Sequence, residues 1–103
     1  MTYEKYSDIP VTTTPDFQGK EIKKYLGIVC AEKASSINVL LGRKMLASYE
    51  NSLFDTREEA LKDIQDQAKA LGANAIVGID INYDVLGQTN IIMVSVSGTA
   101  VVI

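Results

Sequence analysis

Apolar residues follow a helical period most clearly between residues 55 and 72. Five of them recur at helical spacing on one stripe: Ala60, Leu61, Ile64, Ala68 and Leu71. At the start, Asp55 or Thr56 with a glutamate three residues on forms a capping-box pattern. At the end, Gly72 can take the left-handed conformation that stops a helix. The pattern predicts one main helix that starts at residue 55 or 56 and is ended by Gly72.

Alternation of apolar and polar residues predicts four strands. Residues 76–86 and 91–103 flank the sequence GQTN, whose Gly and Asn are typical of a hairpin loop. Residues 20–31 also alternate, and the β-branched residues 11–14 form a short strand that ends at Pro15. The segment 35–52 is ambiguous, because β-branched residues open it and Gly42 interrupts its helical pattern.

This order of elements predicts an α+β fold, with an antiparallel sheet of about four strands and one main helix packed on one face. The apolar sheet face that would meet the helix is Val77, Ile79, Ile81, Tyr83, Val85, Ile92, Val94, Val96, Ala100 and Val102. The opposite face is apolar at its ends and polar at its centre. It consists of Ile76, Gly78, Asp80, Asn82, Asp84, Ile91, Met93, Ser95, Ser97, Thr99 and Val101.

Size and composition suit one compact domain: the chain has 103 residues, 47% of them hydrophobic and 22% charged. We expect a flexible N-terminal extension at 1–8 and a single domain at 9–103. A net charge of −3 with ten scattered Lys and Arg argues against nucleic-acid binding. No apolar stretch reaches the roughly 20 residues of a membrane helix, and the single cysteine suits a reducing compartment. We therefore expect a soluble, cytoplasmic protein.

Candidate chemistry is limited by the absence of histidine, which removes Ser-His-Asp and Cys-His catalysis and every His-containing zinc site within one chain. The single cysteine, Cys30, lies in an apolar stretch, which favours a buried, unreactive thiol. A metal site built on Cys30 would need several subunits to converge on one axis.

The sequence DINYD at 80–84 resembles the opening of a calcium loop. That loop requires glycine at its sixth position and glutamate at its twelfth, where this chain has Val85 and Ile91. Alternation instead places Asp80, Asn82 and Asp84 on one face of a strand.

We expect this acidic strand face to lie opposite three hydroxyl residues of the following strand: Ser95, Ser97 and Thr99. Three interpretations remain open: a solvated face, the polar lining of an oligomer channel or ligand pocket, and paired carboxylates for acid–base chemistry. Near the helix start, Tyr49 and Arg57 indicate surface or interface packing and would be natural anchors for a protein partner.

Several segments together resemble one family. They are VTTTPDFQGKEIKKYLGIV, LGANAIVGIDINYDV and MVSVSGTAV. These sequences are similar to the YbjQ-like family, a bacterial and archaeal group often labelled as heavy-metal-binding, over most of residues 9–103. The resemblance implies a small subunit, similar to the dodecin-like fold, that assembles into a ring of five. The segment 33–48 is shorter than the middle region usual in that family.

The leading hypothesis is a ring-forming cytoplasmic protein, a homo-pentamer by the resemblance, that binds a metal or small ligand without catalysis. The family label implies a divalent or heavy metal, for which Asp80, Asp84 and Cys30 are the candidate ligands. Asn82, Ser95, Ser97, Thr99, Tyr49 and Arg57 are the candidate interface or ligand-facing residues. The alternatives are a carboxylate-based hydrolase or lyase in a subunit cleft, and a protein-interaction scaffold.

Overall fold

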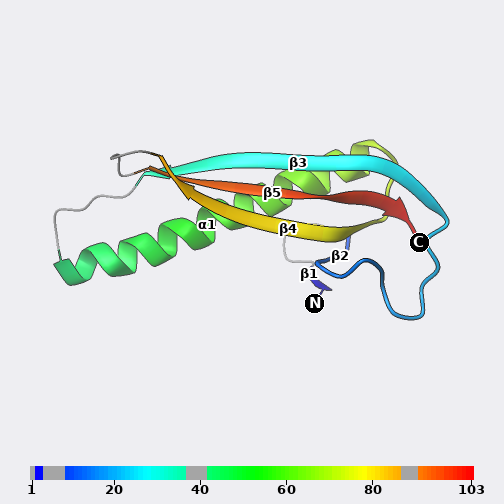
Figure 1. Ribbon diagram of the computed structural model, residues 1–103, viewed down its shortest axis with the longest axis horizontal. Helices are drawn as coiled ribbons and strands as arrows, with labels where there is room; N and C mark the ends of the chain where they lie inside the picture. The colour runs from blue at the N-terminus through cyan, green and yellow to red at the C-terminus, as the bar shows by residue number, and fades with distance from the viewer. Residues whose placement is uncertain (1, 4–8, 37–41, 87–90) are drawn as a thin grey trace.

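The computed structural model describes residues 2, 3, 9–36, 42–86 and 91–103, of which 2, 3, 36 and 42–52 are described by backbone alone. Its elements are β1 (Thr2–Tyr3), β2 (Val11–Thr12), β3 (Lys24–Ser36), α1 (Gly42–Ala70), β4 (Ala75–Val85) and β5 (Ile91–Val102). The strands form one sheet in the order β1-β2-β4-β5-β3, and α1 lies along one face of it (Figure 1). The predicted α+β fold, with one main helix on one sheet face, is confirmed.

The sheet is mixed rather than wholly antiparallel. The long strands β3, β5 and β4 pair antiparallel. At the loop end of the predicted hairpin, Leu86 N–H donates to Ile91 O at 3.0 Å, and the loop residues 87–90 lie outside the described residues. β2 instead pairs parallel to β4, with Val11 opposite Ile76. Parallel strands need a long connection, and the chain between β2 and β4, which contains β3 and α1, provides it.

The helix begins at Gly42, well before the predicted start at Asp55 or Thr56. Thr56 is buried within the helix and caps nothing. Residues 43–55 are rich in Arg, Lys, Met, Leu, Ala and Glu, which favour helix, and Gly42 stands at the first position where it interrupts nothing. The ambiguous segment 35–52 thus supplies the end of β3 and the first turns of α1.

The C-terminal end of α1 is as predicted. Gly72 has a φ of 90°, in the left-handed region. Gly72 N–H donates to Lys69 O at 3.0 Å, and Ala73 N–H donates to Ala68 O at 3.0 Å. These two bonds form a Schellman motif, which satisfies carbonyls that the last turn leaves without helical partners.

The main core lies between α1 and the sheet. Four of the five predicted helix residues are buried there, Ala60, Leu61, Ile64 and Ala68, whereas Leu71 is 49% exposed. β5 alternates between half-buried and buried positions from Ile91 to Ala100, so Val94, Val96 and Ala100 meet the helix as predicted. Burial of this apolar surface is the main stabilising term of the fold.

A β-bulge in β4 exchanges two predicted positions. Between the pairs Val77–Thr99 and Asp80–Ser97, β4 has two residues where β5 has one. Gly78 has a φ of 65° in this bulge, and the extra residue places Ile76 with Ile79 in the helix-side core. The prediction that Val77 faces the helix and Ile76 faces away is therefore wrong, because it assumed strict alternation.

The opposite sheet face is covered at one end by the chain itself. Ala75, Val77 and Val101 are buried there, and partly buried side chains of Phe17, Ile22 and Ile103 pack against them. The rest of this face, towards the β4–β5 hairpin, has no covering element among the described residues. We call it the uncovered face, defined by the outward residues of β3 from Ile28 to Ala34 with their neighbours on β5 and β4.

The molecule is elongated, with extents of 51 × 21 × 20 Å. In Figure 1 the C-terminal half of α1 overlies the strands, while its N-terminal half diverges from the sheet. No helix of the described residues is long and apolar enough to cross a membrane.

Candidate functional site

The uncovered face brings together residues that are far apart in the sequence. Cys30 of β3 lies opposite Ser97 of β5, and Ser97 lies opposite Asp80 of β4. Directly paired residues point to the same side of an antiparallel sheet, so the three side chains form one row across the strands. Cys30 and Asp80 are exposed.

A second row runs beside the first. Glu32, Ser95 and Asn82 are paired in register across the same three strands. The two rows are connected, since Asn82 Nδ2 donates a hydrogen bond to Asp80 Oδ2 at 2.7 Å. The predicted polar centre of this face is therefore present, with Glu32 as a member that the sequence did not single out.

Asp84 and Thr99 do not face the partners we expected. Asp84 lies opposite Met93, and Thr99 lies opposite Val77 and Ile28. The bulge at Gly78 explains the unexpected partner of Thr99, because the shifted register places Val77 rather than a polar residue opposite Thr99. The hydroxyls opposite the acidic strand are thus those of Ser95 and Ser97 alone.

Cys30 is exposed, so the prediction of a buried thiol is wrong. The core-side residues here are its neighbours Val29 and Ala31, which are buried against α1. A bulge between Tyr25 and Gly27 also places Leu26 on the helix side, which separates it from Ile28 and Cys30. The apolar residues around Cys30 point to both faces of the sheet, and only those on the helix side are packed.

The donors on this face do not form a metal site within one chain. Cys30 and Asp80 are separated by the whole width of β5, about 10 Å between outer strands. The described residues contain no group of three or more Cys, Asp and Glu placed to hold an ion. A thiolate and carboxylates also suit different metals, soft and hard respectively. The residues present therefore do not fit a closed heavy-metal centre.

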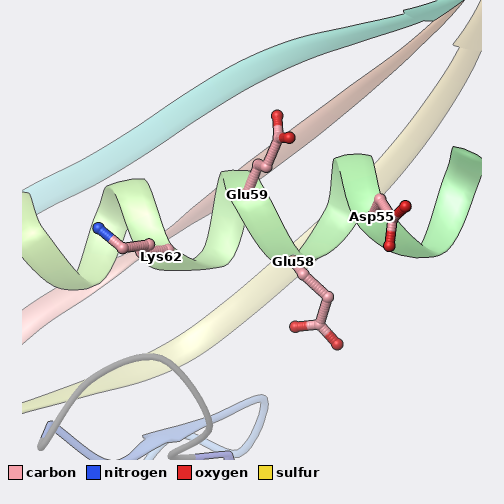
Figure 2. A pocket seen from close by; sticks show the side chains of 4 residues that line it. All are labelled: Asp55, Glu58, Glu59 and Lys62. Atoms are coloured by element: carbon pink, nitrogen blue, oxygen red, sulfur yellow. The ribbon is translucent and has the colours of Figure 1, made fainter.

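A hollow on α1 is lined by three further carboxylates, which do not converge on one point. It has a volume of about 230 Å³ and is lined by Asp55, Glu58, Glu59 and Lys62. Figure 2 shows the Glu58 and Glu59 carboxylates on opposite sides of the helix, with Asp55 and Lys62 to either side along its length. Their charged ends point in different directions, which gives this hollow no common ligand position.

A larger groove lies between α1, β2 and β4, on the helix side of the sheet. Its volume is about 370 Å³. Arg57 stands in its wall: Nη1 donates to the Tyr83 hydroxyl at 3.3 Å, and the guanidinium lies 5.3 Å from the centre of the Phe54 ring. Arg57 was predicted as an interface residue, but Phe54 and Tyr83 were missed as its partners. Tyr49 lies in α1, and its side chain is outside the described residues.

The fold and these surfaces define a class: a small α+β protein whose sheet is packed on one face and left largely open on the other. Residues 9–103 match the model of the YbjQ family, which is described as "Putative heavy-metal-binding". The chain belongs to this family.

Three relatives, each named UPF0145 protein, have similar length and sequence. The protein of Acetivibrio thermocellus is 44% identical, with coverage of 90% of this chain and 97% of that protein. The protein of Clostridium kluyveri is 45% identical with the same coverage. The protein of Listeria ivanovii is 43% identical, with coverage of 90% and 94%.

A solved structure has the same fold. It is the crystal structure of a protein of unknown function, of the DUF74 family, from Pediococcus pentosaceus. The TM-score is 0.69 at 21% identity, with coverage of 92% of this chain and 97% of that one. At this identity the likeness concerns the fold alone.

Proposed function

We propose that the protein is a non-catalytic binding or scaffold module that assembles into a ring of identical copies. The observation that carries the proposal is a pair of exposed apolar surfaces at different places on the chain. Large exposed apolar patches on a small domain mark interaction sites. Five copies is the number that the family resemblance suggests.

The first surface is at the outer strand β3. Tyr25 is 68% exposed and Ile28 is 81% exposed, both on the face away from α1. β3 is the last strand in the sheet order, so its outer edge pairs with no strand of the described residues. The Gln67 side chain occupies the edge groups of Cys30, and the groups to either side of Cys30 remain for another chain. This combination of apolar side chains and an open edge suits contact with another chain.

The second surface is at the hairpin end of β4. Tyr83, Val85 and Leu86 are 46%, 64% and 40% exposed. Tyr83 lies opposite Val94 and Val85 lies opposite Ile92, both buried residues, so this surface is on the helix side of the sheet. It is therefore distinct from the surface at Tyr25 and Ile28.

Two different surfaces favour a head-to-tail assembly. A two-fold dimer brings the same surface of both copies together, whereas contact between unlike surfaces leaves one of each free and closes only as a ring. The proposal places this ring in the cytoplasm, in accord with the single cysteine. The net charge of −3 argues against nucleic acid as its partner.

Light scattering coupled to size-exclusion chromatography tests the assembly. The wild-type protein should elute as a ring, and either Ile28→Glu or Val85→Glu should give monomers, because each buries an unpaired charge in the contact. Ala70→Glu, at an exposed position at the end of α1, adds the same charge and should leave the ring intact. A wild-type protein that remains monomeric at micromolar concentration would refute the proposal.

A mixing experiment tests the head-to-tail geometry. Each glutamate variant retains one intact surface, so an equimolar mixture of Ile28→Glu and Val85→Glu should form a heterodimer and stop there. A contact between like surfaces would give homodimers of at least one variant alone. Native mass spectrometry distinguishes these outcomes when one variant is isotope-labelled.

A further inference from the structure

We infer that the groove between α1, β2 and β4 binds an amphipathic anion, a carboxylate with an apolar tail. Its volume of about 370 Å³ falls in the range of small-molecule sites. The site is formed within one chain, and it shares Tyr83 with the second surface of the proposed ring.

The floor of the groove accounts for the apolar tail. Leu61 and Ile79 are buried at its base, and Ile81 is half-buried on the same side of β4. Phe54 and Tyr83 extend this apolar wall towards solvent, at 41% and 46% exposure. A hydrocarbon chain laid in the groove would remove these surfaces from water, which is the main source of affinity in such sites.

The wall of the groove accounts for the carboxylate. Arg57 is half-buried and its position is set by the Tyr83 hydroxyl and the Phe54 ring. Among the described residues, no carboxylate lies within ion-pair distance of its guanidinium, so N–H donors remain for a ligand. A guanidinium held in this way is suited to bidentate recognition of a carboxylate.

The Glu58 carboxylate in the groove sets the orientation of a bound anionic ligand. Its side chain also lines the groove and is 4% exposed. Successive residues of a helix point about 100° apart, so Arg57 and Glu58 project in different directions. The anionic group of a ligand therefore belongs at the end with Arg57, Phe54 and Tyr83, away from Glu58.

Titration with decanoate, followed by calorimetry and by amide NMR shifts, tests the inference in the full-length protein. Decanoate should bind the wild type and shift the amides of Ile79 and Ile81. Arg57→Gln should weaken decanoate about tenfold and leave the neutral analogue decanol unaffected. Lys62→Gln removes the same charge outside the groove and should bind decanoate like the wild type. Ile81→Trp fills the groove and should weaken both compounds.

Several results would overturn the inference. These are the absence of decanoate binding to the wild type, equal binding by Arg57→Gln and Lys62→Gln, or amide shifts confined to other surfaces. Circular dichroism verifies that each variant is folded, and Tyr83→Phe provides a second, milder change because it removes only the hydroxyl that holds Arg57. Ile28→Glu leaves the groove unchanged and should bind decanoate at least as tightly as the wild type, because no neighbouring copy then covers Tyr83. Weaker binding by this variant would also contradict a single-chain site.

Discussion

The side-chain amide of Gln67 pairs with both backbone groups of Cys30. Its Nε2 donates to Cys30 O at 2.7 Å, and its Oε1 accepts from Cys30 N–H at 3.3 Å. Cys30 lies on the outer strand β3, so this amide occupies the place that a further strand would take. The contact fastens α1 to the sheet edge and closes the middle of that edge to other chains.

Replacement of Gln67 should therefore weaken the fold. Gln67→Ala removes two hydrogen bonds and should lower the free energy of unfolding by about 1–2 kcal/mol. Gln67→Glu keeps the acceptor but turns a second oxygen towards Cys30 O, so we expect no smaller loss. Urea denaturation measures both. Lys62→Ala breaks only the exposed pair with Asp66 and should cost less than about 0.5 kcal/mol; a similar cost for Gln67→Ala would contradict the role assigned to the amide.

The bulge in β4 should depend on the backbone of Gly78. Its φ of 65° is unfavourable for residues with a Cβ, and no heavy atom lies within 4 Å of where that Cβ would be. Gly78→Ala should therefore lower the free energy of unfolding by about 1–2 kcal/mol through conformation alone. Gly78→Asn should cost less than Gly78→Val, because asparagine tolerates this region. Thermal unfolding of the three variants checks this order, and equal stability of Asn and Val variants would argue against it.

Two substitutions of Gln65 should differ in their effect on the free energy of unfolding, because one removes only a hydrogen bond and the other also removes buried volume. Gln65 is fully buried, its Nε2 donates to Ile9 O at 2.9 Å, and its Oε1 accepts no hydrogen bond from the described residues. Gln65→Leu loses the bond but also removes the unpaired oxygen, so the free energy of unfolding should change by less than about 1 kcal/mol. Gln65→Ala leaves a cavity as well and should cost about 2–4 kcal/mol. Chemical denaturation compares them, with Ile64→Val as a core control, and equal costs for the two Gln65 variants would be the contrary result.

The donor arrangement predicts that Cys30 forms no heavy-metal centre in a single chain. Calorimetric titration with zinc or cadmium should give the same weak heats for the wild type and for Cys30→Ser. Asp80→Asn serves as the matched change at the other end of the row. Tight zinc binding that is lost in Cys30→Ser would contradict this expectation and would indicate ligands brought together by several copies.

Local periodicity was enough to predict the packed helix face and the alternation of β5. Ile64 and Ala68 recur at the helical repeat, and Val94 and Val96 at the strand repeat. Each repeat depends only on neighbouring residues, so it can be recognised without knowledge of the fold. The helix stop at Gly72 is local in the same sense. Sequence patterns do not locate the start of α1, because the capping pattern at Asp55 resembles a helix start even though the helix already runs through the preceding residues.

The candidate site depended on information that is not local. Strict alternation cannot anticipate a bulge, and a shift of one residue moves a side chain to the other sheet face. Ile76 and Val77 were exchanged for this reason. The row of Cys30, Ser97 and Asp80 required the register of three strands, and the contact of Arg57 with Tyr83 required the packing of α1 on the sheet.

The amino-acid sequence by itself determined the class of fold, the family and the residues that can be buried, because these follow from composition, short-range repeats and similarity to relatives. Tertiary structure alone decided which apolar residues are left exposed and which polar residues share a surface. Ile28 and Val85 have the same apolar chemistry as the core residues Ile64 and Val94, yet only the latter are packed against a second layer. Burial depends on what lies across from a side chain, and that is set by the packing of α1 on the sheet.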